Sequence, residues 1–233
     1  MAKEPRFGAG QVFTAVALVV FSVPLLVADL LDPTQGNLGE ARLDIADVGA
    51  HPTAFLASTV LVYISTLALL PATAGLWRVG RLHRRRLTGV GAGLVALGAL
   101  GHAALVTFNG FLAAMPPGDV DAMAALLDRV NEGLVLLLVF PLLLALSVGI
   151  VVLTLALWRG GIAPLWCFLA TCVMFCGDFI AGVMPGARVF LVYGLLVVVT
   201  ARLAAAVLRM PASPWNIPAP PATEPAVRAE MSA

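Results

Sequence analysis

The residues of this sequence that could take part in chemistry are acidic residues whose carboxyl groups stand in apolar surroundings. Asp178 stands among apolar neighbours that include Phe175 and Phe179. Such surroundings favour the protonated form of a carboxyl, and a protonated carboxyl can act as a general acid or pass on a proton. Once ionised, the same group can pair with a cation. The alternative is a structural role, as a hydrogen-bond partner of Asn109, of Tyr193 or of a helix end.

Like Asp178, several other polar side chains stand near an end of an apolar stretch. Asp29 lies near the end of the first stretch, and His51 and Glu132 open the second and the fourth. We take Asp178, Glu132 and Asp29 together as the candidate catalytic residues. For His51 and Glu132 the alternative is that each caps the helix that it begins.

A binding pocket would draw on a wider set of side chains. The candidate ligand-binding residues are polar groups near helix ends, one deeper histidine and aromatic rings, namely His51, Asn109, Tyr193, His102, Phe108, Phe111, Phe175 and Phe179. A lone histidine among glycine and alanine, as at His102, is more often a hydrogen-bond donor between helices than a ligand. Since His51, Glu132 and Asp178 lack the short spacing of a metal site, we expect neither a metal nor another cofactor.

The apolar stretches define the fold class. The chain has 233 residues, of which 61% are hydrophobic and 12% charged, and a soluble domain of this size cannot bury so much apolar surface. A membrane-spanning helix needs about 20 apolar residues. The sequence therefore predicts an all-α, polytopic membrane helix bundle with six transmembrane helices, at residues 11–31, 53–77, 88–114, 133–157, 163–184 and 187–209.

The charges in the linkers predict the orientation of the bundle. Arginines crowd the linker 78–87, whereas acidic residues dominate the linkers 32–52 and 115–132. Basic ends mark the cytoplasmic side of a membrane protein. We therefore expect a multi-pass protein of the bacterial cytoplasmic membrane with both termini in the cytoplasm. Because the single basic linker is a topology signal, we expect no nucleic-acid partner.

Composition divides the chain into a cytoplasmic N-terminus (1–10), a transmembrane domain (11–210) and a Pro- and Ala-rich cytoplasmic tail (211–233) that we expect to be disordered. Within the first acidic linker, apolar residues recur at helical spacing. They predict a short amphipathic surface helix whose apolar side carries Leu38, Ala41, Ile45 and Val48.

Small side chains in the third and fifth stretches indicate packing rather than chemistry. Glycine lets neighbouring helices approach closely, and the third stretch contains Gly89, Gly91, Gly93, Gly98 and Gly101. The fifth stretch holds all three cysteines, at Cys167, Cys172 and Cys176. Their helical spacing suits small buried side chains and implies no disulfide framework.

A faint internal repeat relates the second and third stretches to the fourth and fifth. Trp77 and Trp158 each precede an arginine at the end of a stretch, and Asn109 and Asp178 each stand six residues before a Met-Pro pair. A true repeat of these hairpins would be parallel, about an axis along the membrane normal. Interfacial anchors and helix-ending prolines can also produce this pattern by chance.

The layout resembles small, uncharacterised six-span membrane proteins of high-GC Gram-positive bacteria over nearly the whole chain. The features that carry this resemblance are the His51-Pro52 entry, the basic Arg84-Arg85-Arg86 run and the turn Leu157-Trp158-Arg159-Gly160-Gly161. This resemblance implies no activity. The chain is also similar in size to small membrane-embedded terpene cyclases, which use carboxylates and no cofactor to protonate an isoprenoid. That resemblance implies a catalytic part for Asp178 with Glu132 or Asp29.

These observations favour a membrane protein that binds or handles a lipophilic small molecule, a lipid or an isoprenoid, in a cavity in the outer half of its bundle. The alternatives are a membrane-embedded terpene cyclase and a small transporter. A closed apolar pocket containing Asp178 would favour the cyclase, whereas a polar path through both leaflets would favour transport. The expected partners are membrane lipids and the lipophilic molecule itself.

Overall fold

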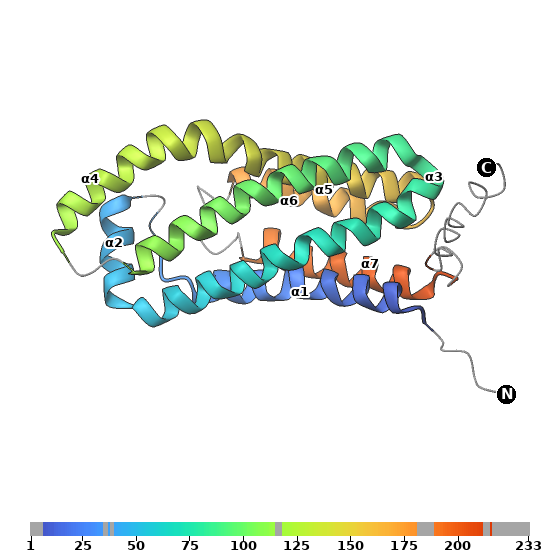
Figure 1. The fold of residues 1–233 in the computed structure, drawn as a ribbon, viewed down its shortest axis with the longest axis horizontal. Coiled ribbons are helices and arrows are strands. Elements are labelled where there is room, and N and C mark those ends of the chain that lie inside the picture. Colours follow the sequence, from blue (N-terminus) through green and yellow to red (C-terminus); the bar gives the residue numbers. More distant parts are fainter. Residues whose placement is uncertain are drawn as a thin grey trace, which may run out of the picture.

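Helices account for every regular element in the described part of the chain (Figure 1), which confirms the all-α class. The computed structural model describes residues 7–34, 37, 40–114, 118–180, 189–211 and 215, and for residues 134–136 and 178–180 the description is limited to the backbone. The elements are α1 (Ala9–Leu31), α2 (Ala41–Ala50), α3 (Pro52–Ala114), α4 (Val120–Val130), η1 (Asn131–Val139), α5 (Phe140–Arg159), α6 (Leu165–Ile180), η2 (Val189–Gly194) and α7 (Leu195–Arg209).

Four helical runs are long and apolar enough to cross a membrane. They are α1, α3, the continuous run from α4 through η1 into α5, and the run from η2 into α7. Helix α6 is apolar as well, but only Leu165–Gly177 qualifies and it is shorter than the other runs. The predicted apolar stretches thus correspond to apolar helices, and the structure is compatible with a membrane protein.

Helix α3 is two antiparallel helices joined by a bend. Its 63 residues would extend for roughly 95 Å as a straight helix, about three times the thickness of the hydrocarbon core. The backbone leaves the helical region at Arg84, where φ is −141° and ψ is 61°, and Figure 1 shows the chain turning back there. Thr66 contacts His102 across the two halves, and a side chain at Gly80 would meet Thr88. The predicted basic linker is therefore helical on both sides of a single turn.

The second acidic linker, residues 115–132, contains a helix that the sequence analysis did not predict. Helix α4 begins after Asp119, whose carboxylate accepts hydrogen bonds from the backbone N–H groups of Asp121 and Ala122. This is the usual way to satisfy the first free N–H groups of a helix. Because α4 continues without a break through η1 into α5, Glu132 lies inside a helix and does not cap one.

Helices α2 and α4 lie against each other at one end of the bundle, which we call the acidic end (Figure 1). Helix α2 confirms the predicted amphipathic surface helix, since Ala41, Ile45 and Val48 are its buried residues; Leu38 lies outside the described residues. Ala41 and Ile45 join a small apolar cluster with Ala124 and Leu127 of α4. One exposed ion pair, from Arg42 to Asp121 at 3.1 Å, crosses between these two elements.

The distribution of polarity is that of a protein surrounded by apolar solvent. Buried hydroxyl groups link helices in the interior: Ser22 of α1 accepts from Thr200 of α7 at 2.7 Å, and Thr154 of α5 bonds Thr171 of α6 at 2.8 Å. The outside carries large apolar side chains on every long helix, including Val16, Val19, Leu67, Leu70, Leu97, Leu100, Leu169, Val173 and Val198. Exposed apolar surface on this scale marks a membrane or partner interface.

Glycines bring the second half of α3 close to α5. The sequence analysis predicted this role for five glycines of α3, and the structure bears it out for three of them. A side chain at Gly91 would lie 2.7 Å from the backbone nitrogen of Leu153, and one at Gly149 of α5 would lie 2.6 Å from the nitrogen of Val95. Gly98 and Gly101 also contact α5 closely. The predicted Gly89 and Gly93 differ, because a side chain there would meet no atom within 4 Å.

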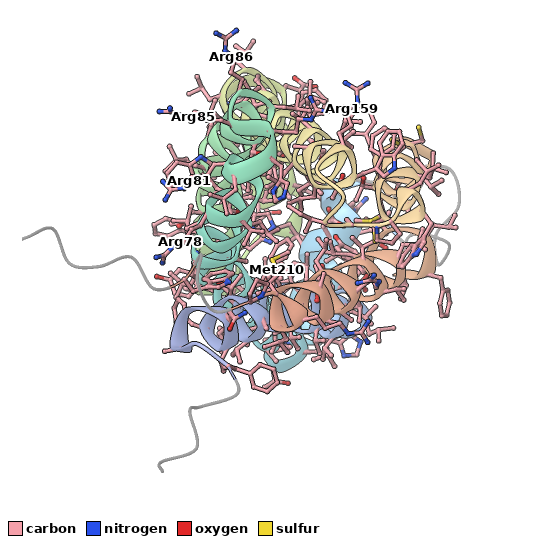
Figure 2. The ribbon with its side chains drawn as sticks, turned by 90° about the vertical axis from the view of Figure 1, so that its right-hand side faces the viewer. Arg78, Arg81, Arg85, Arg86, Arg159 and Met210 are labelled. Atoms are coloured by element: carbon pink, nitrogen blue, oxygen red, sulfur yellow. The ribbon has the colours of Figure 1, made fainter. Side chains whose placement is uncertain are left out.

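The opposite end of the bundle carries the bend of α3, the start of α1 and the end of α7 (Figure 1). We call it the basic end, because Arg78, Arg81, Arg85, Arg86 and Arg159 all lie there (Figure 2). Trp215 belongs to the large buried cluster at this end and is only 7% exposed. Trp215 of the predicted tail is thus packed against the bundle, and residues 212–214 and 216–233 lie outside the described residues.

Candidate functional site

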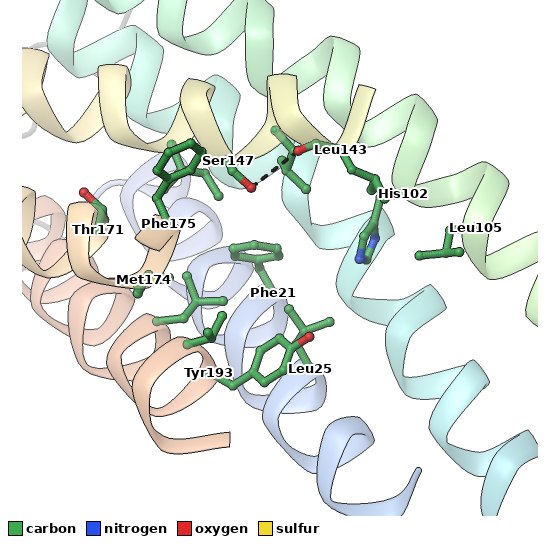
Figure 3. A pocket seen from close by; sticks show the side chains of 14 residues that line it. Phe21, Leu25, His102, Leu105, Leu143, Ser147, Thr171, Met174, Phe175 and Tyr193 are labelled. Atoms are coloured by element: carbon green, nitrogen blue, oxygen red, sulfur yellow. Dashed lines mark hydrogen bonds between the residues drawn. The ribbon is translucent and has the colours of Figure 1, made fainter. Parts of the chain in front are cut away.

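A cavity of about 200 Å³ lies between α1, the second half of α3, α5, α6 and the η2–α7 run (Figure 3). Phe21 and Leu25 line it from α1, and they stand 12 and 16 residues after the start of that helix at Ala9. Because α1 has 23 residues, the cavity extends from the middle of the bundle toward the acidic end.

The lining is mainly apolar, with a few polar groups. Aliphatic and aromatic side chains from all five walls make up most of it, namely Phe21, Leu25, Leu105, Leu143, Leu146, Ile150, Met174, Phe175, Val192 and Leu196. Four polar residues interrupt them: His102, Ser147, Thr171 and Tyr193. An apolar cavity with a small number of polar groups that fix orientation is typical of small-molecule sites.

The bonds of Thr66 fix how His102 presents its imidazole. The Thr66 hydroxyl bonds the backbone oxygen of Val62 at 2.8 Å and lies 2.6 Å from Nδ1 of His102. A hydroxyl has one proton, and the oxygen of Val62 can only accept. We therefore assign the proton of the second bond to the imidazole, so that Nδ1 donates to Thr66. In the neutral imidazole this leaves Nε2 as a hydrogen-bond acceptor.

The other polar groups differ in how far the protein already uses them. The Thr171 hydroxyl is committed, since it bonds the Phe168 oxygen and Thr154, both at 2.8 Å. The Ser147 hydroxyl makes one long bond of 3.4 Å to the backbone oxygen of Leu143, drawn as a dashed line in Figure 3. Bonds of that length are weak, so Ser147 can turn to a ligand at little cost.

Tyr193 reaches the cavity from the π-helical segment η2. Its ring lies beside Phe21 on the wall made by α1 and η2, while His102 approaches from α3 (Figure 3). Segments of π-helix are rare and recur at functional sites, because the extra residue per turn redirects the side chains that follow.

Three of the sequence-predicted residues come together in this cavity: His102, Tyr193 and Phe175. The prediction that His102 joins helices is also confirmed by its bond to Thr66. Asp178 and Phe179 lie in the same helix as Phe175, but their side chains lie outside the described residues. The catalytic and structural roles predicted for Asp178 therefore stay predictions.

The remaining predicted residues lie elsewhere toward the acidic end. Asp29 is buried near the end of α1, at 6% exposure, but does not line the cavity. Phe108 packs against the cluster of α2 and α4, and Asn109 beside it is half-buried. His51 ends α2 and is exposed. Glu132 and Phe111 are exposed too, with Phe111 at 65%.

An acidic cluster at the end of α1 and on α2 has a distinct organisation. The side-chain nitrogen of Asn37 donates to Asp44 at 3.1 Å and to Asp47 at 2.9 Å. Partial burial raises the pKa of the Asp44 carboxyl, the bond from Asn37 lowers it, and the Asp32 and Asp47 carboxylates raise it further. Over the described residues, no group of three or more His, Cys, Asp or Glu side chains is arranged to hold a metal ion.

Known proteins offer no template for this site. No protein-family model, curated protein or solved structure matches the chain. The resemblances to six-span membrane proteins of high-GC Gram-positive bacteria and to terpene cyclases therefore stay expectations from sequence.

Sequence reasoning missed most of the cavity wall. Phe21, Leu143 and Met174 are ordinary apolar residues in apolar stretches, and nothing in the sequence distinguishes them from lipid-facing neighbours. Ser147 is different, because it is one of two hydroxyl residues in the stretch 133–157, with Thr154, and a hydroxyl inside such a stretch needs an interior partner. Its presence was a signal that could have placed α5 on the cavity.

Proposed function

We propose that this chain is an integral membrane protein that binds a lipophilic small molecule, a lipid or an isoprenoid, in the cavity between α1, α3, α5, α6 and α7. The observation that carries the proposal is the apolar cavity of about 200 Å³ interrupted by His102, Ser147 and Tyr193. Apolar walls supply most of the binding free energy, at about 25 cal/mol per Å² of apolar surface removed from water, and the polar groups select the ligand's polar end.

The polar end of the ligand follows from the assigned imidazole. With Nδ1 committed to Thr66, Nε2 of His102 accepts a hydrogen bond, so the ligand should carry a donor such as a hydroxyl. Ser147 lines the same cavity from α5 and can accept or donate a hydrogen bond to a polar group of the ligand. A lipophilic alcohol fits this combination better than a pure hydrocarbon, because a hydrocarbon would leave the imidazole without a partner.

The topology that we propose has six spans. Helix α3 contributes two, on either side of Arg84, and α1, α4–α5, α6 and η2–α7 contribute one each. The basic end then faces the cytoplasm of a bacterial cell, according to the positive-inside rule, and the acidic end with α2 and α4 faces outward. With this orientation, the proposed cavity lies in the middle and outer part of the bundle, and the positions of Phe21 and Leu25 in α1 support this.

The alternative functions find less support in the geometry. The terpene cyclase depends on Asp178, whose side chain lies outside the described residues. Glu132 and Asp29 do not line the cavity, so the described part of the lining supplies no carboxylate for that reaction. For transport, a polar path would have to continue toward the basic end. There the adjoining cavity is only about 40 Å³ and its polar members, such as Thr154 and Thr200, already bond other residues.

Filling the cavity tests the proposal. Ser147→Phe places a ring in the space, whereas Ser147→Ala is the matched control that keeps the volume. The purified proteins are heated in a neutral detergent with geraniol, an isoprenoid alcohol, or with myrcene, its hydrocarbon counterpart. We expect geraniol to raise the Tm of the wild type and of Ser147→Ala by a few degrees, through binding to the folded state, and to leave Ser147→Phe unchanged.

A second variant separates the apolar from the polar part of the site. His102→Leu keeps an apolar wall but removes the acceptor, so it should respond equally to geraniol and myrcene. If Ser147→Phe is stabilised as much as the wild type, the cavity is not the binding site. If geraniol and myrcene act alike on the wild type, the assigned role of His102 is wrong.

A further inference from the structure

A groove at the basic end differs in character from the central cavity. It has a volume of about 460 Å³ and lies between the start of α1 and the first half of α3. Its charged and aromatic members are Trp77, Arg78, Arg81 and Trp215, and none of its lining residues is shared with the central cavity. Figure 2 shows Arg78 and Arg81 on the same side of this end, with Met210 near the middle of the bundle.

Trp215 forms one wall of this groove because the end of α7 is tied to α1. The side-chain nitrogen of Gln11 donates to the backbone oxygens of Val207, at 3.2 Å, and Met210, at 2.7 Å. The indole of Trp215 then packs on Gly10, where an added side chain would lie 3.0 Å from the ring. The docked indole is 7% exposed, so its position is set by packing on α1.

Arg78 connects this wall to α3. One terminal nitrogen of its guanidinium donates to the backbone oxygen of Trp215 at 3.0 Å, and the guanidinium carbon lies 5.7 Å from the indole centroid. Arg81, one turn further along α3, lies over the ring of Trp77 at 4.8 Å. Aromatic rings thus hold both guanidinium groups along the groove, and no carboxylate lies among the described residues that line it.

Two buried donors at this site lack an acceptor among the described residues. They are Nε of Arg78 and the indole nitrogen of Trp215. Buried N–H groups are nearly always hydrogen-bonded, so a buried N–H group without an acceptor indicates a partner that is not among the described residues. Both of these atoms are donors and one belongs to a cation, so the missing partner is an anionic oxygen.

The remaining walls are apolar. Phe13 of α1 and Pro71 and Ala74 of α3 line the groove on the side toward the middle of the bundle, and Phe13 is among the exposed large hydrophobic residues. Arginine and tryptophan side by side at the end of apolar helices occupy the level of lipid headgroups in a membrane. An acyl chain from the same lipid would then run along Phe13.

We infer that this groove binds the phosphate group of an anionic phospholipid from the leaflet at the basic end. Arg78 and the indole N–H of Trp215 donate to the phosphate oxygens, Arg81 supplies the second positive charge, and Phe13 contacts an acyl chain. The Nε–H group of Arg78 and the indole N–H group are both covered by protein atoms, so this binding mode requires the guanidinium of Arg78 and the indole to turn toward the groove. The site holds α1, α3 and Trp215 together through a lipid.

Lipid titration of the purified full chain tests this inference. The probes are phosphatidylglycerol, phosphatidylcholine with the same acyl chains, and inorganic phosphate, each added to the protein in neutral detergent while its Tm is measured. We expect phosphatidylglycerol to raise the Tm saturably and the other two probes to have no effect at equal concentration. Arg78→Gln should weaken the apparent affinity about tenfold, as expected for a lost charge-assisted hydrogen bond.

Two further variants keep the test informative if Arg78→Gln fails to fold. Trp215→Phe retains an aromatic ring in the packed position and removes the indole N–H together with the second ring of the indole, so it should weaken the affinity by a smaller factor, roughly threefold. Arg85→Gln is the control, because Arg85 is exposed at the same end but does not line the groove, and its affinity should match the wild type.

Three outcomes would overturn the inference. Equal stabilisation by phosphatidylcholine would show that charge is not recognised. Stabilisation by inorganic phosphate alone would assign the groove to a free anion rather than to a lipid. A loss in Arg85→Gln as large as that in Arg78→Gln would show a diffuse attraction to the basic end. None of these results bears on the central cavity, whose test uses uncharged ligands and other residues.

Discussion

At the scale of single residues, the interior of this protein is organised by hydroxyl groups and one imidazole. Residue type predicted the role of His102, because a neutral polar side chain in an apolar helix must find a partner, and Thr66 is that partner. Residue type could not predict that Tyr193 reaches the cavity while Asn109 does not. Both side chains lie near helix ends, and which way each points depends on local helix geometry, including the π-helical turn of η2.

The carboxyl of Asp44 makes the acidic end sensitive to pH. Its pKa is raised in the folded protein above the value of 3.8 for a free side chain, mainly by burial. The folded state therefore binds the proton more tightly than the unfolded chain. This contribution to stability is complete below pH 3.8 and is lost as the pH rises through the folded-state pKa. At neutral pH the charged carboxyl is held in a partly buried position.

We predict that Asp44→Asn raises the Tm at pH 7 by one or two degrees, because a partly exposed site changes the free energy of unfolding by less than about 1 kcal/mol. The amide oxygen keeps an acceptor for Asn37. The gain should shrink toward zero as the pH falls through the folded-state pKa to below 3.8, where the wild-type carboxyl is protonated in both the folded and the unfolded state. The control is Asp128→Asn on the exposed side of α4, and a gain at pH 7 that does not shrink on acidification would contradict the prediction.

At the scale of elements, hydrophobicity predicted where apolar helices lie but not how they begin, bend and join. The pattern of Ala41, Ile45 and Val48 was enough to predict α2. Helix α4 was missed because its acidic residues suggested a polar linker, although the cap at Asp119 and the alanines that follow favour a helix. The turn of α3 is limited to Arg84, a position that nothing distinguishes from the arginines beside it.

The repeat of hairpins 53–114 and 133–184 also belongs to this scale, and it stays a prediction. The two turns are built differently. The first is a break in one helix at Arg84, whereas the second is a short connection between α5 and α6 in which Gly161 has a φ of 72°. Asn109 is half-buried, but the side chain of Asp178 lies outside the described residues, so their equivalence is open.

The packing of α3 on α5 gives a prediction with an internal control. Gly91→Ala would place a methyl group 2.7 Å from the backbone nitrogen of Leu153, and backbone atoms cannot move aside as a flexible side chain does. We expect a loss of about 1–3 kcal/mol in the free energy of unfolding, as for other overpacked interiors. The measurement is denaturation in mild detergent.

Gly93→Ala is the matched control on the same helix, since an added methyl there meets nothing within 4 Å. It should be neutral or stabilising by up to about 1 kcal/mol, because alanine is the better helix former. Equal stability of the two variants would show that α3 and α5 do not approach as closely as the structure has them.

At the scale of the whole molecule, polarity is arranged along the bundle axis as well as from inside to outside. Arginines occupy one end and carboxylates the other, with the lipophilic cavity between them (Figures 1 and 2). The sequence predicted this axis, because charge in linkers is readable without a structure. It could not predict the cavity, because a cavity arises from side chains of five segments whose relative rotation only the packed bundle defines.

The orientation that we propose in the membrane follows from this axis and can be measured directly. In a background where Cys167, Cys172 and Cys176 are replaced by alanine, single cysteines are placed at Arg84, on the bend of α3, and at Asp119, before α4. Intact bacterial cells are treated with a membrane-impermeant maleimide. We expect labelling at residue 119 and none at residue 84 until the cells are opened, because the excess of arginine keeps the bend in the cytoplasm. The two sites lie at opposite ends of the second half of α3, so labelling of both in intact cells would show that this half does not cross the membrane. Labelling at residue 84 alone in intact cells would show that the protein has the opposite orientation. The proposed phosphate site at Arg78 would then lie in the outer leaflet.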